Sequence, residues 1–181
     1  MSGALALADG MVFGGESVGA PGLAVGEVVF TTAMTGYQEI LTDPSYAGQI
    51  ITMTSPHIGN YGVAEQDDQA LAPACSGLIV RALSRRASSW RADGDLGAYL
   101  RRHDIVALAD LDTRRLTRHV RSAGAMAGAI GDAADVAELV ERAKAHGGME
   151  GRDLATTVTR TGWTEVPASC SPAVAHVVAY D

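Results

Sequence analysis

The stretch GEVVFTTAMTGYQEILTDPSYAGQIITMTSPHIGNYG, residues 26–62, decides the fold of this 181-residue chain. Two runs rich in β-branched residues, at 24–32 and 48–54, are bounded by glycine and proline, which predicts two strands. A short helical turn is expected between them at 35–40, and a loop follows at 43–45. The two strands therefore flank a helical turn and an Asp-Pro-Ser loop.

This loop and its flanks are more polar than a connection between two strands requires. Their hydrogen-bonding side chains are Tyr37, Gln38, Glu39, Thr42, Ser45, Tyr46 and Gln49. The density is well above that of a plain turn, which suggests a second task for the stretch.

The segments on either side extend the pattern. Upstream, two apolar runs around Asp9 and Gly10 are typical of a tight hairpin. Downstream, strands and helices alternate, with strands expected at 77–83, 105–110 and 125–131 and helices at 95–104, 112–124 and 132–148. Asp95 and Asp112 stand where helix N-caps are expected. We therefore predict an α/β fold: a three-layer β/β/α domain with a partly parallel sheet, an antiparallel sheet and helices on one side.

Composition narrows the class of protein. Apolar residues make up 47% of the chain and charged residues 19%, which fits a globular domain with a real core. The net charge of −7 argues against nucleic acid or an anionic membrane as a partner. No apolar run approaches the ~18 residues of a membrane helix, and the N-terminus lacks the basic region of a signal peptide. With two distant cysteines, these features predict a cytoplasmic protein.

The regular pattern weakens toward the C-terminus. Residues 165–176 are rich in proline, serine and alanine, as linkers are, and HVVAYD then predicts a new buried strand. We expect a domain at 1–155 and a linker at 156–175. The expected strand at 176–181 would be the first of a further domain that this sequence does not include.

No residue has the surroundings of a catalytic group. Cys75 lies in PACSGLIV, unlike the G-x-C-x-G of a glutaminase elbow, and Cys170 lies in the expected linker. His57 is more simply a hydrogen-bonded histidine of a structured loop than a functional group. No paired Cys/His spacing indicates a metal, and the glycines at 14–26 fit turns rather than a phosphate-binding motif. We expect no catalytic residue, cofactor site or metal site in this domain.

Three arginines form a positive stripe on an otherwise acidic chain. Arg114, Arg118 and Arg121 are spaced by four and three residues, which places them on one helix face. A solvated face opposite Leu116 and Val120 is the simplest interpretation. An ion-paired contact with a partner protein is the alternative.

Three blocks carry a resemblance to a known family: residues 26–62, RRHDIVALADLDTRRLTRHVRSAGAMAGAI at 101–130, and HVVAYD at 176–181. Together they resemble the small, glutamine-hydrolysing subunit of carbamoyl-phosphate synthetase. The most specific part is TGYQE-LTDPSY-GQI followed by PHIGN-G. The resemblance covers nearly the whole chain and is weakest at 156–175.

The resemblance implies a β/β/α domain followed by a class I glutamine amidotransferase domain, whose Cys-His-Glu triad releases ammonia from glutamine. The large subunit, which binds ATP and Mg, would combine ammonia with bicarbonate and two ATP into carbamoyl phosphate for arginine and pyrimidine biosynthesis. The present domain would be non-catalytic, dock on the large subunit and help form the glutamine pocket. The resemblance assigns Ser45 to that pocket, which would explain the polar loop by its facing the neighbouring domain.

Two alternatives remain open. A stand-alone ligand-binding or interaction domain on the same fold is one, although such a domain has no reason to begin a strand at HVVAYD. A self-sufficient hydrolase that uses Cys75 or Ser45 is the other, although the sequence shows no base and orienting group for it.

Overall fold

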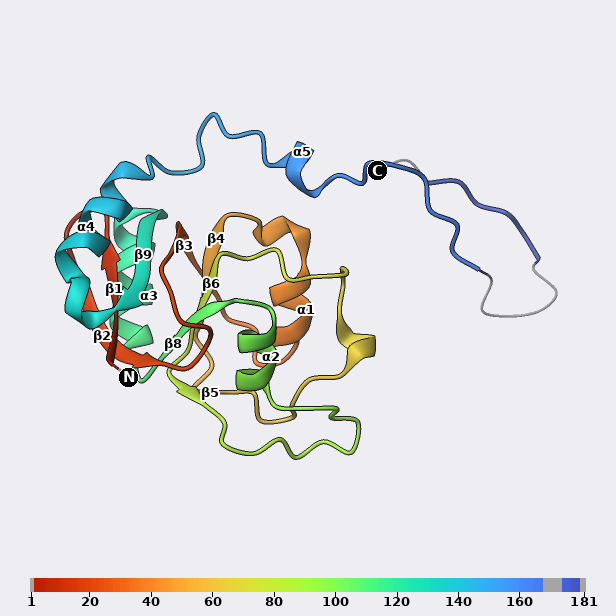
Figure 1. Cartoon of the computed structure of the whole chain (residues 1–181), viewed down its shortest axis with the longest axis horizontal. Helices are drawn as coiled ribbons and strands as arrows, with labels where there is room; N and C mark the ends of the chain where they lie inside the picture. The colour runs from red at the N-terminus through yellow and green to blue at the C-terminus, as the bar shows by residue number, and fades with distance from the viewer. Residues whose placement is uncertain (1, 168–173, 180–181) are drawn as a thin grey trace.

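The computed structural model describes residues 2–167 and 174–179. Within them seven strands form one closed sheet in the order β1-β2-β8-β6-β4-β3-β9, and β5 pairs with β7 (Figure 1). The strands are β1 (Ser2–Leu7), β2 (Val12–Ser17), β3 (Ala24–Thr31), β4 (Gln49–Met53), β5 (His57–Ile58), β6 (Gly77–Ile79), β7 (Ala82–Leu83), β8 (Val106–Ala109) and β9 (Met126–Asp132). The α-helices are α1 (Tyr37–Thr42), α2 (Leu96–Arg102), α3 (Thr113–Ala123), α4 (Val136–Ala145) and α5 (Ala155–Val158). Single 3₁₀ turns lie at Pro44–Tyr46, Glu65–Asp67 and Ala133–Asp135.

The closed sheet has a parallel half and an antiparallel half. Strands β3, β4, β6 and β8 pair in parallel. Strand β1 pairs antiparallel with β2 and β9, β9 pairs antiparallel with β3, and a short antiparallel pairing of β2 with β8 closes the ring. The predicted α/β class, with a partly parallel layer and an antiparallel layer, is confirmed.

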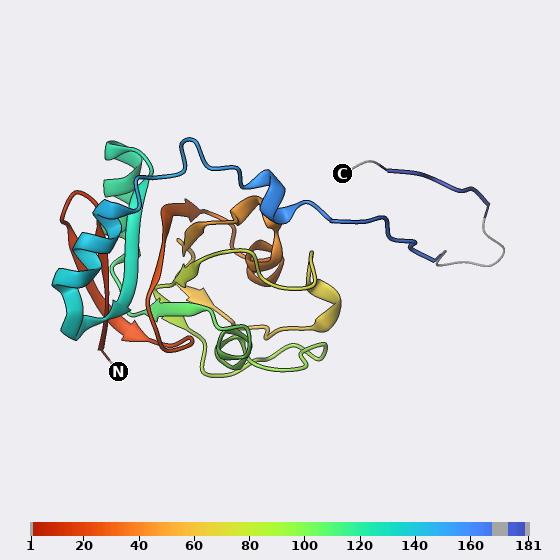
Figure 2. The same ribbon diagram turned by 45° about the horizontal axis from the view of Figure 1, so that its top comes forward.

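Alternate residues of the strands pack into separate apolar clusters. Ile50 of β4 faces the cluster between the two halves of the sheet, into which Leu116 and Val120 of α3 also pack. Ile51 and Met53 face the outer cluster, which α1 and α2 cover. Helix α4 packs on the antiparallel half, against β1 and β9 (Figure 2). Helices α1 and α2 form a layer on one side as expected, but α4 covers the opposite face, so the helices do not all lie on one side.

Both predicted N-caps are confirmed, the helix expected at 132–148 begins only at Val136, and the strand predicted at 77–83 is wrong. The Asp95 carboxylate accepts a hydrogen bond from the Ala98 amide at 2.8 Å, and Asp112 caps α3 in the same way at 2.9 Å. The strand expected at 77–83 is two strands, because the chain leaves the closed sheet after Ile79 and β7 pairs with β5 instead.

The hairpin predicted at Asp9 and Gly10 is also confirmed. Gly10 has a φ of 91°, which suits glycine, and Asp9 Oδ1 accepts a hydrogen bond from the Met11 amide at 3.0 Å. Asp9 Oδ2 lies 2.6 Å from Nε2 of His119 on α3. Partial burial raises the pKa of Asp9, but the bonds from Met11 and His119 outweigh it and hold the pKa below its usual value. This carboxylate therefore ties the hairpin to α3.

Beyond α5 the described residues leave the body of the domain (Figure 1). Residues 159–167 and 174–179 have no regular secondary structure and are exposed. Residues 176–179 thus do not form the expected strand here, and 180–181 lie outside the described residues. The division at 155 and the further domain stay predictions.

Candidate functional site

Ser45 lies in the exposed 3₁₀ turn Pro44–Tyr46, between α1 and β4. The Asp43 carboxylate accepts a hydrogen bond from the Ser45 amide at 2.8 Å and thereby caps the turn. The Ser45 hydroxyl makes no hydrogen bond to another described residue. Asp43 therefore performs the capping that a serine hydroxyl often provides.

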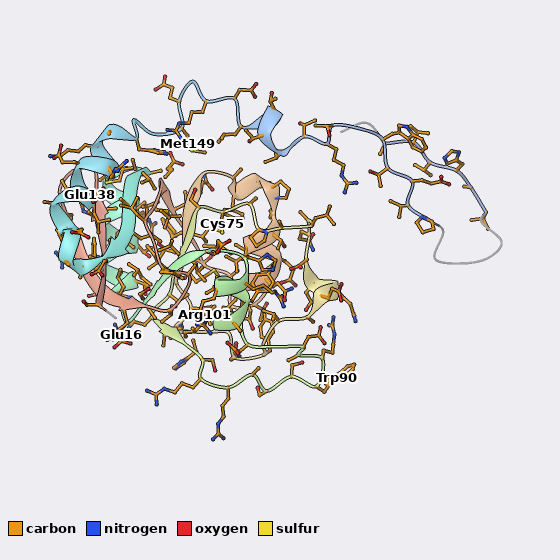
Figure 3. The ribbon with its side chains drawn as sticks, in the orientation of Figure 1. Glu16, Cys75, Trp90, Arg101, Glu138 and Met149 are labelled. Carbon is orange, nitrogen blue, oxygen red and sulfur yellow. The ribbon has the colours of Figure 1, made fainter. Side chains whose placement is uncertain are left out.

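The chain that follows α4 passes beside this turn. Gly48 has a φ of 74°, and a Cβ added to it would lie 3.4 Å from Sδ of Met149 and 3.7 Å from Cδ1 of Leu154. Met149 is labelled in Figure 3 on the segment that crosses above the strands. The Ser45 turn and the segment that leads to the expected linker therefore lie on the same side of the domain.

The most polar part of the stretch points inward rather than toward the Ser45 turn. Gln38 is 1% exposed. Its Nε2 donates to the Ala64 carbonyl and to Asp68 Oδ1, both at 2.7 Å, and its Oε1 accepts from the Ala64 amide at 2.9 Å. Gln38 therefore fixes residues 61–69, which we call the 61–69 loop, against α1.

Two residues near Gln38, on the same helix, also contact the 61–69 loop. The Thr42 hydroxyl accepts a hydrogen bond from the Gln69 amide at 2.8 Å. The Tyr37 hydroxyl donates to the Gly62 carbonyl, and its ring stacks on Tyr61 with the ring centroids 4.3 Å apart. Burial raises the pKa of Tyr37, so this hydroxyl stays a donor at neutral pH. The expectation that the whole stretch is polar because it faces a neighbouring domain is wrong for these side chains.

The other candidate residues are Cys75, which forms a β-bridge with Ala47 just after the Ser45 turn, together with His57 and Cys170. Cys75 precedes β6, and burial raises the pKa of its thiol to about 12, which disfavours the thiolate a nucleophile needs. His57 in β5 is exposed, and the hydrogen bond expected for it does not form with any described residue. Cys170 lies outside the described residues.

Residues 2–167 and 174–179 contain neither a cluster of metal-ligating side chains nor a helix that could span a membrane. No group of three or more His, Cys, Asp or Glu that could hold a metal ion occurs there. No helix in this part of the chain is both long and apolar enough to cross a membrane.

The basic stripe on α3 has the predicted geometry. Arg114, Arg118 and Arg121 are exposed on the face opposite the buried Leu116 and Val120. None of the three arginines pairs with a described residue. Their shared face is therefore confirmed, and their positive charges are unneutralised within the described structure.

The sequence of this chain is similar to those of one family of known proteins. The family model "Carbamoyl-phosphate synthase small chain, CPSase domain" matches residues 5–130. The carbamoyl phosphate synthase small chains of Pectobacterium atrosepticum and Yersinia pseudotuberculosis are each 49% identical to this chain, and that of Escherichia coli K12 is 48% identical, over 99% of the chain. The chain spans about half the length of these relatives (51%, 50% and 51%). With the model match covering more than half of its residues, the chain belongs to the carbamoyl-phosphate synthase small chain family.

Proposed function

We propose that this chain is the N-terminal, non-catalytic domain of a carbamoyl-phosphate synthase small chain, which docks on the large chain and helps form the glutamine pocket. The proposal rests on a similarity that extends over 99% of this chain but over only about half the length of its relatives. The parent enzyme would make carbamoyl phosphate from glutamine, bicarbonate and two ATP for arginine and pyrimidine biosynthesis in the cytoplasm. ATP and Mg²⁺ would bind the large chain, and this domain would bind no cofactor.

The surroundings of Ser45 support its part in the glutamine pocket. Its hydroxyl has no partner among the described residues, and the turn that presents it is exposed and capped by Asp43. The segment 149–154 lies against Gly48, just after this turn. An amidotransferase domain that follows the linker could therefore pack on this side and place glutamine near the Ser45 hydroxyl.

The purified 181-residue chain is expected to release no ammonia from glutamine above the buffer rate. The Cys-His-Glu triad would belong to the other half of the small chain. At a thiol pKa of about 12, Cys75 would be ionised in roughly one molecule in 10⁵ at pH 7. A coupled assay for ammonia tests this, with Cys75→Ser as the control. Glutamine turnover that disappears in Cys75→Ser would refute the non-catalytic assignment.

Reversing two charges of the stripe, Arg118→Glu with Arg121→Glu, is expected to weaken assembly of the full-length small chain with the large chain roughly tenfold at low salt. The loss should shrink at high salt, because exposed ion pairs are screened. Arg142→Glu with Lys144→Glu on α4 is the matched control, since it makes the same charge change elsewhere. Equal affinities of the two double variants would remove the stripe from the interface.

A further inference from the structure

A cavity of about 360 Å³ lies beside the start of α1, on the side of the domain away from α4. Segments far apart in the sequence meet there: the end of the β3–α1 connection, the 61–69 loop and the loop at 84–95. The side chains that matter for its chemistry are those of Thr35, Glu39, Tyr61, Asp67, Ser89 and Arg91.

The charges of this cavity are unbalanced. Nη2 of Arg91 lies 2.7 Å from Oδ1 of Asp67, so these two groups neutralise each other. Glu39 also lines the cavity, and its Oε2 is buried without a hydrogen-bond partner in the described structure. A buried carboxylate oxygen without a donor is unfavourable. The cavity therefore contains a negative charge with no opposite partner and an acceptor oxygen with no donor in the described structure.

Two large apolar side chains next in sequence to residues that line the cavity are exposed. Trp90, between the lining residues Ser89 and Arg91, is 93% exposed, and Met34, next to Thr35, is 77% exposed. Figure 3 shows Trp90 at the edge of the molecule, projecting from the loop. A small ligand inside the cavity would leave both side chains in water, whereas a protein surface would cover them. Tryptophan, methionine and arginine are also enriched at protein interfaces.

We propose that this surface docks a partner protein that inserts an arginine or lysine side chain into the cavity against Glu39 and packs apolar side chains on Trp90 and Met34. The unpaired carboxylate selects the positive charge. The apolar contacts exclude water around the ion pair, which strengthens it. The inference rests on the proposed function for the partner's identity, which is the large chain of the synthase.

The first experiment tests the cavity without the large chain. Nα-acetyl-arginine amide is titrated into the ¹⁵N-labelled 181-residue chain, and the amide signals of residues 35–39 and 61–64 are followed. We expect saturable shifts in the millimolar range, typical of a single charged contact. The uncharged Nα-acetyl-citrulline amide should bind at least tenfold more weakly. Glu39→Gln should weaken binding of the arginine probe to the same extent, and Glu16→Gln, at an exposed acid on β2, should not.

The second experiment tests whether the large chain is the partner that fills the cavity. The affinity of the full-length small chain for the large chain is expected to fall at least tenfold in Glu39→Gln and in Trp90→Ala. Glu16→Gln and Trp163→Ala, the latter at a tryptophan that is 90% exposed, are the matched controls.

The outcomes separate the inference from the proposed function. Absence of Glu39-dependent shifts with the arginine probe overturns the cavity as a cation site. Unchanged assembly in Glu39→Gln and Trp90→Ala overturns the large chain as its occupant. A wild-type small chain that does not bind the large chain contradicts the proposed function, and the probe titration still decides whether the cavity takes a basic group.

Discussion

Replacing Gln38 by alanine is expected to lower the melting temperature of the domain by roughly 10 °C. The change leaves the amide and the carbonyl of Ala64 without their partner and removes one donor from Asp68. Each orphaned buried group costs about 1–3 kcal/mol, so a total of about 3 kcal/mol is reasonable. For a domain of this size that corresponds to about 2–4 °C per kcal/mol. Scanning calorimetry of the 181-residue chain measures the shift.

Two further variants make this test specific. Gln38→Glu keeps the size of the side chain but replaces the donating Nε2 by an oxygen that faces the Ala64 carbonyl and the Asp68 carboxylate. It should be at least as destabilising at pH 7 as the alanine variant. Gln49→Ala is the control, because Gln49 makes one longer, half-buried bond, 3.3 Å to Glu27, and its loss should shift the melting temperature by less than about 2 °C. A Gln38→Ala protein that melts with the control would show that the 61–69 loop does not depend on this side chain.

Local signals in the sequence predicted most of the elements. The β-branched runs at 24–32 and 48–54 correspond to β3 (Ala24–Thr31) and β4 (Gln49–Met53) to within about a residue at each end. Asp95 and Asp112 were identifiable as caps because a short carboxylate side chain directly before an apolar helical repeat is typical of a helix N-cap. These features depend on neighbouring residues alone, which explains why a single sequence suffices for them.

The errors concern contacts between distant residues. The break after Ile79 depends on β7 pairing with β5, a change of partner that the apolar run GLIVRAL does not reveal. The closure of the sheet depends on Glu16 pairing with Ala109 and Ser17 with Leu108. These pairs are far apart in the sequence, and no local pattern specifies them.

The polar stretch shows where sequence reasoning about the site succeeds and where it stops. Its unusual density of hydrogen-bonding groups does mark a stretch that does more than connect two strands. Gln38 and Thr42 are four residues apart, next to Tyr37 and Leu41, and these four are the buried residues of α1. This spacing was a signal that the two polar side chains face the core. Their partners lie in the 61–69 loop, and the sequence does not indicate that contact.

The cavity at Glu39 was not predicted either. Glu39 and Trp90 are far apart in the sequence. They reach the same part of the surface only because the loop at 84–95 folds back beside α1. The assignment of Ser45 came from the resemblance to a family, and the structure adds that Asp43, not the Ser45 hydroxyl, caps the turn. Serine hydroxyls often bond the backbone of their own loop, but the Ser45 hydroxyl makes no such bond with a described residue.

In the full-length small chain, Ser45→Phe is expected to raise the KM for glutamine roughly a hundredfold, because the larger ring would occupy space that the substrate needs, at a cost of up to about 3 kcal/mol. Ser45→Ala should raise it roughly two- to tenfold, since a neutral hydrogen bond contributes about 0.5–1.5 kcal/mol. Synthesis of carbamoyl phosphate from free ammonia should be nearly unchanged in both variants, because ammonia bypasses the pocket.

Measurements of stability complete this test of Ser45. The Ser45 hydroxyl has no partner among the described residues, so Ser45→Ala should leave the melting temperature unchanged. Asp43→Ala removes the cap at 2.8 Å and should cost about 1 kcal/mol. A glutamine KM that stays at the wild-type value in both Ser45→Ala and Ser45→Phe would take Ser45 out of the pocket. A raised KM with an unchanged melting temperature in Ser45→Ala would instead assign the effect to the substrate, because a merely structural serine would change stability first.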